Sequence, residues 1–240
     1  MNFDISVLIA THNGRVPLRR AVNSALASDA PDCRVQVCIC DDASTNDTYE
    51  VMQSLTSDHV KITRHEKNLG TAQGYNSAAA IADGKYFIIL GDDDWFEGKA
   101  LAGLLKALRQ FPGRKFAYGA TKYWGERHDV VAPPKFQADD FWHQFASLYA
   151  YLYPRKAWDE GCRYSDIITL ENGRGLGVCD YDFALQLIDK GYTGISMNNF
   201  PVLNYNLGTN SSQTAMIYAR QAQLVAGFRQ RWPKWKGMVL

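Results

Sequence analysis

The sequence lacks the features by which several classes of protein are usually recognised. Its 26 Lys and Arg residues almost balance its 25 Asp and Glu residues, so the formal net charge of +1 provides no general attraction for nucleic acid. It has no basic and then apolar leader, and no apolar run approaches about eighteen residues, so neither a signal peptide nor a membrane span is predicted. These absences predict a cytoplasmic protein.

Cysteine is scarce, and its pattern argues against bridges. The five cysteines are an odd number, and no two of them form a C-x-x-C pair. Cys38 and Cys40 alternate along a strand-like run, which places both on one face of a sheet. We therefore expect reduced thiols in a core, with neither disulfides nor a thiol-bound metal.

The glycine motifs of two common nucleotide-binding folds are also missing. No G-x-G-x-x-G follows the first predicted strand, and no G-x-x-x-x-G-K-[ST] occurs anywhere. The glycines at 173, 175 and 177 are too late in the chain and too compact for the dinucleotide motif. Hydride transfer and P-loop phosphoryl transfer are therefore disfavoured.

The first half of the chain contains a regular alternation of strand and helix patterns. Strands are predicted at 5–10, 35–40, 60–63 and 86–90. Helices are predicted at 16–27, 72–82 and 99–110, and a further helix begins at the N-cap candidates 44–47 and ends at 55. This order predicts an α/β fold, with a mostly parallel central sheet of the Rossmann type and helices on both faces.

The pattern changes after residue 116. Segment 116–165 is rich in aromatic residues and interrupted by proline, and segment 166–178 has the glycines of a mobile loop. Beyond it, a helix is predicted at 180–190, a strand at 202–206 and an amphipathic helix at 213–230. We expect one compact unit of 240 residues, with a nucleotide-type half at about 1–115 and an acceptor-type half at about 116–240.

Three of the predicted strands end in polar side chains, and this is the most informative feature of the chain. These ends contribute Thr11, then Asp41 and Asp42, then Asp92, Asp93 and Asp94. The carboxyl ends of parallel strands share one edge of a sheet, so these residues should meet there. Adjacent carboxylates repel one another unless a cation or basic groups share their field, and Mg²⁺ or Mn²⁺ prefers carboxylate and phosphate oxygens. A solvated acidic turn is the simpler alternative, but the repetition favours a site for a nucleoside diphosphate and a metal.

Five segments of the chain resemble, in order, the motifs of family 2 glycosyltransferases of the GT-A fold. They are Ile5 to Asn13, Val37 to Thr48, Asn68 to Ala72, Tyr86 to Trp95 and Cys179 to Leu187. The resemblance covers about residues 3–110 closely and 175–207 loosely. It implies a GT-A fold and an inverting, hexosyltransferase-type enzyme that uses a nucleotide-sugar donor, with UDP favoured, and a divalent cation, Mn²⁺ or Mg²⁺.

The resemblance also implies roles for residues on the donor side. Asp42 would contact the base, Asp41 would support that loop or the ribose, and Thr11 would lie near the base. Asp93 matches the family's metal-binding carboxylate, and Asp92 would lie beside the ribose or the metal.

Asp180 matches the position of the family's general base. An acceptor hydroxyl is a poor nucleophile until a carboxylate takes its proton, and a cation stabilises the departing diphosphate. A base and an assisted leaving group suffice for one displacement with inversion. Judged from residue type and position alone, Asp180 could equally cap a helix, and Asp42 could cap a turn.

Several positions depart from the family pattern. Gly91 stands where the metal motif usually begins with aspartate, Cys179 where glutamate is common, and Tyr75 where arginine is frequent. The usual arginine and histidine are absent from segment 205–208, which predicts weak metal binding or a ligand from elsewhere. Two alternatives follow: a sugar nucleotidyltransferase, for which Asn13-Gly14-Arg15 is a poor phosphate loop, and a catalytically degenerate nucleotide- or glycan-binding module.

The acceptor is expected to be a hydroxyl of a glycan, a lipid-linked saccharide or another molecule. Aromatic residues of the second half are candidates for stacking on it, although core packing explains most of them equally well: Trp124, Trp142, Tyr149, Tyr151, Tyr153 and Trp158. The basic and aromatic tail, 229–236, is most simply a solvated terminus. The alternatives are peripheral contact with the inner face of a membrane, contact with a polyanionic acceptor, and contact with a second subunit.

Overall fold

The computed structural model describes residues 2–126, 128–133, 135–143, 150–169, 175–176, 178–207 and 219–236. In the first half, strands and helices alternate as predicted, with boundaries close to those expected. The strands are β1 (Ile5–Thr11), β2 (Val35–Asp41), β3 (Val60–Arg64) and β4 (Tyr86–Gly91). The helices are α1 (Arg15–Leu26), α2 (Thr48–Leu55), α3 (Thr71–Ala80) and α4 (Ala100–Gln110).

The second half adds more strands than the sequence patterns predict. Its strands, together with the short strand before α4, are β5 (Trp95–Phe96), β6 (Lys115–Gly125), β7 (Val130–Val131), β8 (Tyr151–Pro154), β9 (Ile168–Thr169), β10 (Gly175–Leu176) and β11 (Thr193–Leu207). Its helices are α5 (Ala138–His143), α6 (Arg155–Asp159), α7 (Cys179–Asp189) and α9 (Gln221–Arg231).

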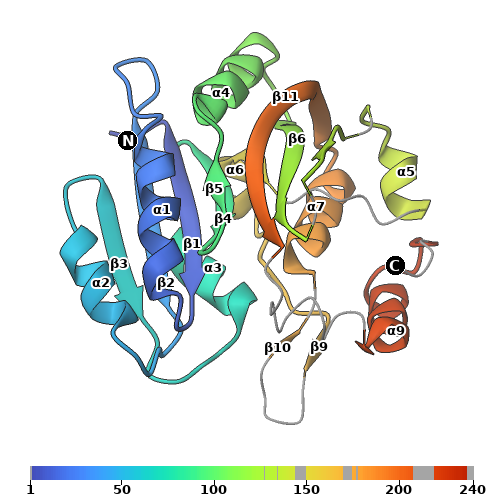
Figure 1. Ribbon diagram of the computed structural model, residues 1–240. Helices are drawn as coiled ribbons and strands as arrows, with labels where there is room; N and C mark the ends of the chain where they lie inside the picture. The colour runs from blue at the N-terminus through green and yellow to red at the C-terminus, as the bar shows by residue number, and fades with distance from the viewer. Residues whose placement is uncertain are drawn as a thin grey trace.

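The described strands form one curled nine-stranded sheet and a small hairpin of β9 and β10. The order is β3-β2-β1-β4-β8-β6-β11-β5, with β7 beside β6. The first four strands are parallel, β8 is antiparallel to both of its neighbours, and β6 and β11 run parallel side by side (Figure 1). None of the described helices is both long and apolar enough to cross a membrane.

Two apolar cores lie on opposite faces of this sheet. One core contains α1 and α4 side chains against residues such as Val7 and Val37, and the other contains α3 and α7 side chains against Leu8 and Cys38. The helices therefore cover both faces, because neighbouring strand residues point to opposite sides. Cys40 shares the core of Cys38, and all five cysteines are buried and free, as predicted.

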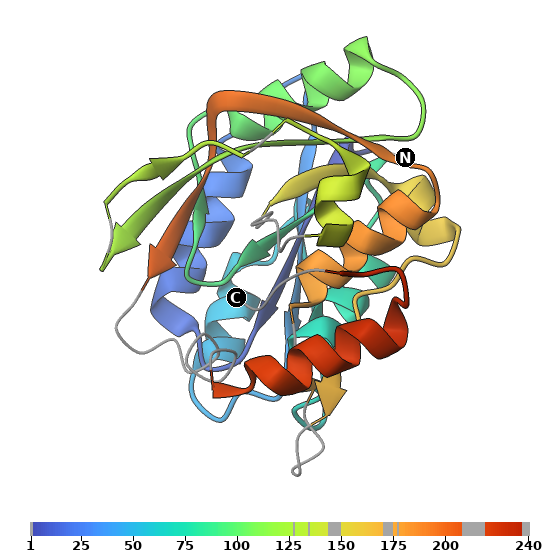
Figure 2. The ribbon, with the colours of Figure 1, turned by 90° about the vertical axis from the view of Figure 1, so that its right-hand side faces the viewer.

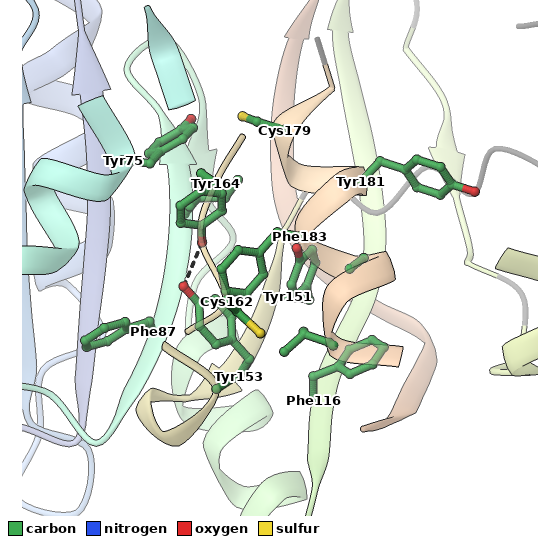
Figure 3. Close-up of a cluster of buried hydrophobic side chains, with 14 of the residues drawn as sticks. Tyr75, Phe87, Phe116, Tyr151, Tyr153, Cys162, Tyr164, Cys179, Tyr181 and Phe183 are labelled. Atoms are coloured by element: carbon green, nitrogen blue, oxygen red, sulfur yellow. Dashed lines mark hydrogen bonds between the residues drawn. The ribbon is translucent and has the colours of Figure 1, made fainter. Parts of the chain in front are cut away.

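The second core is unusually aromatic, as Figure 3 shows. Of the candidates for acceptor stacking, Tyr151, Tyr153 and Trp142 are buried in it, so they are core residues. Trp124 and Trp158 are half-buried, and an Arg163 guanidinium lies 3.8 Å over the Trp158 ring. Tyr149 lies outside the described residues.

The C-terminal tail differs from the prediction. Trp235 is 3% exposed and donates to the Tyr181 hydroxyl at 3.2 Å, and the Lys236 N–H donates to the Trp142 carbonyl at 2.6 Å. Helix α9, in red, lies against α7, in orange (Figure 2). The prediction of a solvated terminus is therefore wrong for the buried Trp235 and the half-buried Trp232, whereas the other six residues of 229–236 are exposed. Residues 213–218 of the predicted helix lie outside the described part.

Candidate active site

The ends of β1, β2 and β4 bring the predicted donor residues together. Thr11 pairs in register with Asp41 on β2, and the residue before it pairs with Gly91 on β4. The Asp42 N–H donates to the Thr11 carbonyl at 2.8 Å, and the Thr11 hydroxyl donates to Asp92 Oδ2 at 2.5 Å. These residues therefore form one acidic rim, defined here as Thr11, Asp41, Asp42 and Asp92 to Asp94.

Glycine 14 allows this close packing. A Cβ atom there would lie 1.9 Å from Asp92 Oδ2 and 2.6 Å from Thr11 Oγ1, so any larger residue would displace these two side chains. Helix α1 begins at the next residue, so its positive N-terminal end faces the Asp92 carboxylate. The departure at Gly91 has a similar cause, because a Cβ atom there would lie 2.7 Å from Asp94 Oδ2.

Asp42 anchors the turn that leads into α3. Its Oδ1 accepts hydrogen bonds from the Leu69 N–H and from His65 Nδ1, both at 2.7 Å, and its Oδ2 accepts one from the Gly70 N–H at 2.8 Å. Gly70 adopts a φ of 93°, which favours glycine. A carboxylate oxygen has two lone pairs, so Oδ2 keeps one acceptor position for a ligand N–H. No sequence pattern marked His65, although this residue directly follows β3 at the same edge.

Asp41 is fully buried and is held differently. Its Oδ1 accepts a hydrogen bond from the Ser44 N–H at 3.0 Å. Its Oδ2 lies 3.1 Å from Arg64 Nε, too poorly aligned for a hydrogen bond, and is left without one among the described residues. Asp41 thus holds the loop after β2 through Ser44.

The acidic triplet after β4 contains carboxyl groups with raised pKa values. Burial raises the pKa of Asp92 to about 6, with a further contribution from the Asp93 charge and an opposing one from the Thr11 hydroxyl. Burial also raises the pKa of Asp93 and, more strongly, that of Asp94. In the described part of the chain no lysine or arginine side chain forms an ion pair with these three carboxylates.

This donor set fits a divalent cation held partly by the protein. The described residues provide no group of three His, Cys, Asp or Glu that would enclose a metal. Asp94 is engaged elsewhere, because its Oδ1 accepts a hydrogen bond from the Asn206 N–H at 2.8 Å and so ties the end of β11 to the rim. Asp92 and Asp93 remain, and Mg²⁺-type sites commonly combine one or two carboxylates with substrate phosphates.

Asp180 lies in the first turn of α7 and keeps some exposure to solvent. Burial raises the pKa of its carboxyl to about 6, while the backbone N–H groups of Tyr181 and of Asp180 itself oppose the shift. Its carbonyl accepts a hydrogen bond from the Tyr151 hydroxyl at 2.7 Å, which fixes the start of the helix. A carboxylate with such a pKa is ionised at neutral pH and still basic enough to accept a proton.

One residue relates Asp180 to the acidic rim. The pKa of Tyr75, on α3, is raised well above its ordinary value by burial first, and then by Cys179, Asp180, Asp92 and Asp94. The carboxylates of α7 and of the β4 loop therefore act on the same hydroxyl group.

Asp166 is a further carboxylic acid with a raised pKa. Its pKa is raised to about 6 by burial and then by the charge of Asp42. A Cβ atom on Gly175 would lie 1.9 Å from Asp166 Oδ2, and one on Gly70 would lie 3.5 Å from it. The half-buried Asp166 thus lies where the β9–β10 hairpin meets the turn before α3, and no motif in the sequence marked it.

Comparison with known protein families identifies the class of this protein. The chain matches the sequence model described as Glycosyl transferase family 2 over residues 6–156. This match spans more than half of the chain, so the protein belongs to glycosyl transferase family 2. The predicted family and enzyme class are confirmed.

Two curated relatives illustrate the similarity in sequence. Chondroitin synthase of Pasteurella multocida is 27% identical over 192 residues, which are 78% of this chain and 19% of that protein. The UDP-Glc:alpha-D-GlcNAc-diphosphoundecaprenol beta-1,3-glucosyltransferase WfaP of Escherichia coli is 29% identical over 127 residues, which are 53% of this chain and 49% of that protein. The chain thus spans about a fifth of the synthase and about half of WfaP.

Two solved structures share the fold. TarS of S. aureus in complex with UDP-GlcNAc has a TM-score of 0.70 at 14% identity, covering 94% of this chain and 66% of that one. The mannosyltransferase PcManGT from Pyrobaculum calidifontis, in complex with GDP-Man and Mn²⁺, has a TM-score of 0.68 at 17% identity, covering 96% and 64%. The predicted GT-A-like fold class is confirmed.

Proposed function

We propose that the protein transfers a sugar from a nucleotide-diphosphate sugar, with UDP as the nucleotide, to an acceptor hydroxyl with inversion. The observation that carries the proposal is the acidic rim, where the Thr11 hydroxyl donates to Asp92 Oδ2 at 2.5 Å and the Asp42 N–H donates to the Thr11 carbonyl at 2.8 Å. A nucleoside diphosphate and its cation need carboxylates gathered at one place, and this rim supplies them. Family membership and the UDP named in two similar proteins support it.

The roles follow from the contacts of each residue. Asp42 receives an N–H of the base at the free position of Oδ2, and Thr11 and Asp41 shape the nucleoside pocket. Asp92 and Asp93 would hold Mn²⁺ or Mg²⁺ together with the diphosphate. The bound cation would offset the negative charge that the diphosphate gains as it leaves.

Asp180 is the base in this proposal. It takes the proton of the acceptor hydroxyl as that oxygen bonds to the anomeric carbon, while the bond from that carbon to the phosphate oxygen breaks. The electron pair of the broken bond goes to the diphosphate. A single displacement of this kind inverts the anomeric centre and needs no second nucleophilic carboxylate.

The acceptor is a glycan or a lipid-linked saccharide in this proposal, and residues 116–240 bind it. The diphosphoundecaprenol substrate in the name of WfaP supports the lipid-linked choice. The cytoplasmic location, at the inner face of the membrane, stays a prediction.

The first experiment is a thermal-shift screen of UDP, GDP and their sugars, with and without Mn²⁺, because a ligand that binds the folded state raises the melting temperature. Release of UDP from the stabilising donor, with and without EDTA, then measures transfer. Asp93→Ala and Asp180→Ala should each abolish transfer with little change in melting temperature, and full activity of either variant contradicts its role. Pyrophosphate release from UTP and a sugar phosphate would instead indicate a nucleotidyltransferase, whereas binding without transfer or hydrolysis would indicate a degenerate module.

A further inference from the structure

Tyr75 is a buried tyrosine whose hydroxyl has no hydrogen-bond partner among the described residues. Its side chain is 7% exposed, and its ring packs on that of Tyr164 with the centroids 5.3 Å apart. Within the described part of the chain, no hydrogen bond is found for its hydroxyl. Figure 3 shows this hydroxyl pointing away from Tyr153 and toward Cys179, the first residue of α7. The hydroxyl is not among the fully buried polar atoms that lack a partner, so it reaches solvent, where a ligand can meet it.

The neighbouring tyrosines are different. Tyr153 and Tyr164 share a hydrogen bond of 2.7 Å between their hydroxyls, and the Tyr151 hydroxyl donates to the Asp180 carbonyl at 2.7 Å. These hydroxyls are used to hold the core together. The Tyr75 hydroxyl is therefore available in a cluster where similar groups are paired.

The packing of α3 fixes where this hydroxyl lies. The preceding residue, Gly74, touches β1 so closely that a Cβ atom on it would lie 2.6 Å from Ala10 Cβ. Ala10 pairs in register with Gly91, and Asp92 follows directly. Tyr75 is thus held beside the strand ends, with the start of α7 opposite.

The charge around Tyr75 keeps the phenol neutral. After burial, Cys179 and the carboxylates of Asp180, Asp92 and Asp94 raise its pKa further. The group therefore stays protonated at any pH at which the protein works, and it remains an O–H donor.

We propose that the Tyr75 hydroxyl donates a hydrogen bond to the sugar that is transferred. This inference rests on the proposed function. The anomeric carbon of the donor is bonded to a diphosphate at Asp92 and Asp93, and it is attacked by an oxygen whose proton goes to Asp180. The sugar therefore lies between these groups, where the Tyr75 hydroxyl is. A neutral phenol suits a sugar oxygen, whereas a phosphate is better matched by a cation.

Tyr75→Phe and Tyr153→Phe form a matched pair for the test. Both remove one buried phenol oxygen from the same cluster, but the second oxygen is paired with Tyr164. With Mn²⁺ present, calorimetry measures the affinity for UDP and for UDP-glucose, UDP-galactose and UDP-N-acetylglucosamine. UDP release to water, which needs no acceptor, measures turnover.

Tyr75→Phe should weaken binding of the accepted UDP-sugar about 10-fold, change UDP binding less than about 2-fold, and keep or raise the melting temperature. Tyr153→Phe should lower the melting temperature and leave both affinities unchanged. Wild-type affinity for the UDP-sugar in Tyr75→Phe would overturn the proposal, and so would an equal loss for UDP and UDP-sugar, because the contact would then be to the diphosphate. If the wild-type protein binds none of these nucleotides, the proposed function itself is overturned. This outcome is distinct from a failure of the Tyr75 proposal, which is judged from the change in affinity between the wild type and its variants.

Discussion

Arg231, at the end of α9, donates two hydrogen bonds to the buried carboxylate of Asp182 on α7, at 2.6 and 3.0 Å. Trp232 Nε1 donates a third at 2.8 Å, and Gln186 Nε2 donates a fourth at 2.8 Å. Asp182 lies two residues beyond Asp180, the proposed base. The C-terminal helix is therefore tied to the helix that carries the proposed base, and Asp182, in the first turn of α7, has a structural role.

Replacing Arg231 should destabilise the protein measurably. In Arg231→Gln, the fully buried Asp182 loses two charge-assisted hydrogen bonds, so we expect the free energy of unfolding to fall by about 2 kcal/mol. Lys234→Gln is the matched control, because it breaks an ion pair with Asp189 in which both side chains are about half exposed and which is worth about 0–1 kcal/mol. Urea denaturation gives both values. Equal losses in the two variants would show that the Asp182 contacts do not stabilise the fold.

The rate of transfer should fall on the acid side of neutrality. The Asp180 carboxyl has a pKa raised by burial to about 6, and only its ionised form accepts a proton. The value of kcat/KM should therefore be constant above about pH 7 and fall about tenfold for each pH unit well below 6. A pH profile at saturating metal checks this, and a limb near pH 4 would argue against Asp180 as the base.

The same pKa shift predicts an effect on stability with a definite sign. A carboxyl whose pKa rises from 3.8 to about 6 on folding stabilises the fold below pH 3.8, and that contribution is lost as the pH rises through 6. Asp180→Asn carries no such charge, so its melting temperature should exceed that of the wild type at pH 7.5 by a few degrees. The difference should vanish toward pH 4. Asp189→Asn, on the last turn of the same helix, should show no gain at pH 7.5, since it only loses its contact with Lys234.

The Thr11 hydroxyl should matter for donor binding. It donates to Asp92 at 2.5 Å and partly offsets the rise in the pKa of that carboxyl. Thr11→Val keeps the shape of a 2% exposed side chain but removes this hydrogen bond, so the affinity for a UDP-sugar should fall about 10-fold. Thr121→Val, a buried threonine on β6, is the control and should bind as the wild type does. Calorimetric affinities that are unchanged in Thr11→Val would exclude this role.

The first half of the fold follows from the sequence because its strands are nearly continuous apolar runs. Val35–Asp41 is buried at every position, and its observed limits differ from the predicted ones by one residue. β6 and β11 were mostly missed, because β6 mixes Lys, Gly and Thr with its aromatics and β11 contains a proline and consecutive asparagines. Their pairing joins Thr193 to Lys115, and such long-range pairing overrides weak local propensity.

The strand-end residues of the candidate site were also predictable from the sequence. Carboxylates that directly follow buried strands had to meet at one edge, and Thr11, Asp42 and Asp92 do. By contrast, the hydrogen bonds between Arg231 and Asp182 join two residues that are 49 positions apart in the sequence. Arg231 lies in a basic segment whose composition predicts a solvated surface. No period or motif in one sequence reports such a contact.

The buried cysteines make the protein a convenient host for a single reporter group. Burial raises the pKa of Cys33 and Cys162 to about 11 and that of Cys38 and Cys40 to about 12, so almost none of the thiolate that reacts with maleimides is present at neutral pH. Val16, at the start of α1, is 72% exposed and lies two residues after Gly14, which packs against the acidic rim. A dye attached through Val16→Cys would then follow occupancy of the donor site in real time, with no native thiol to be removed first.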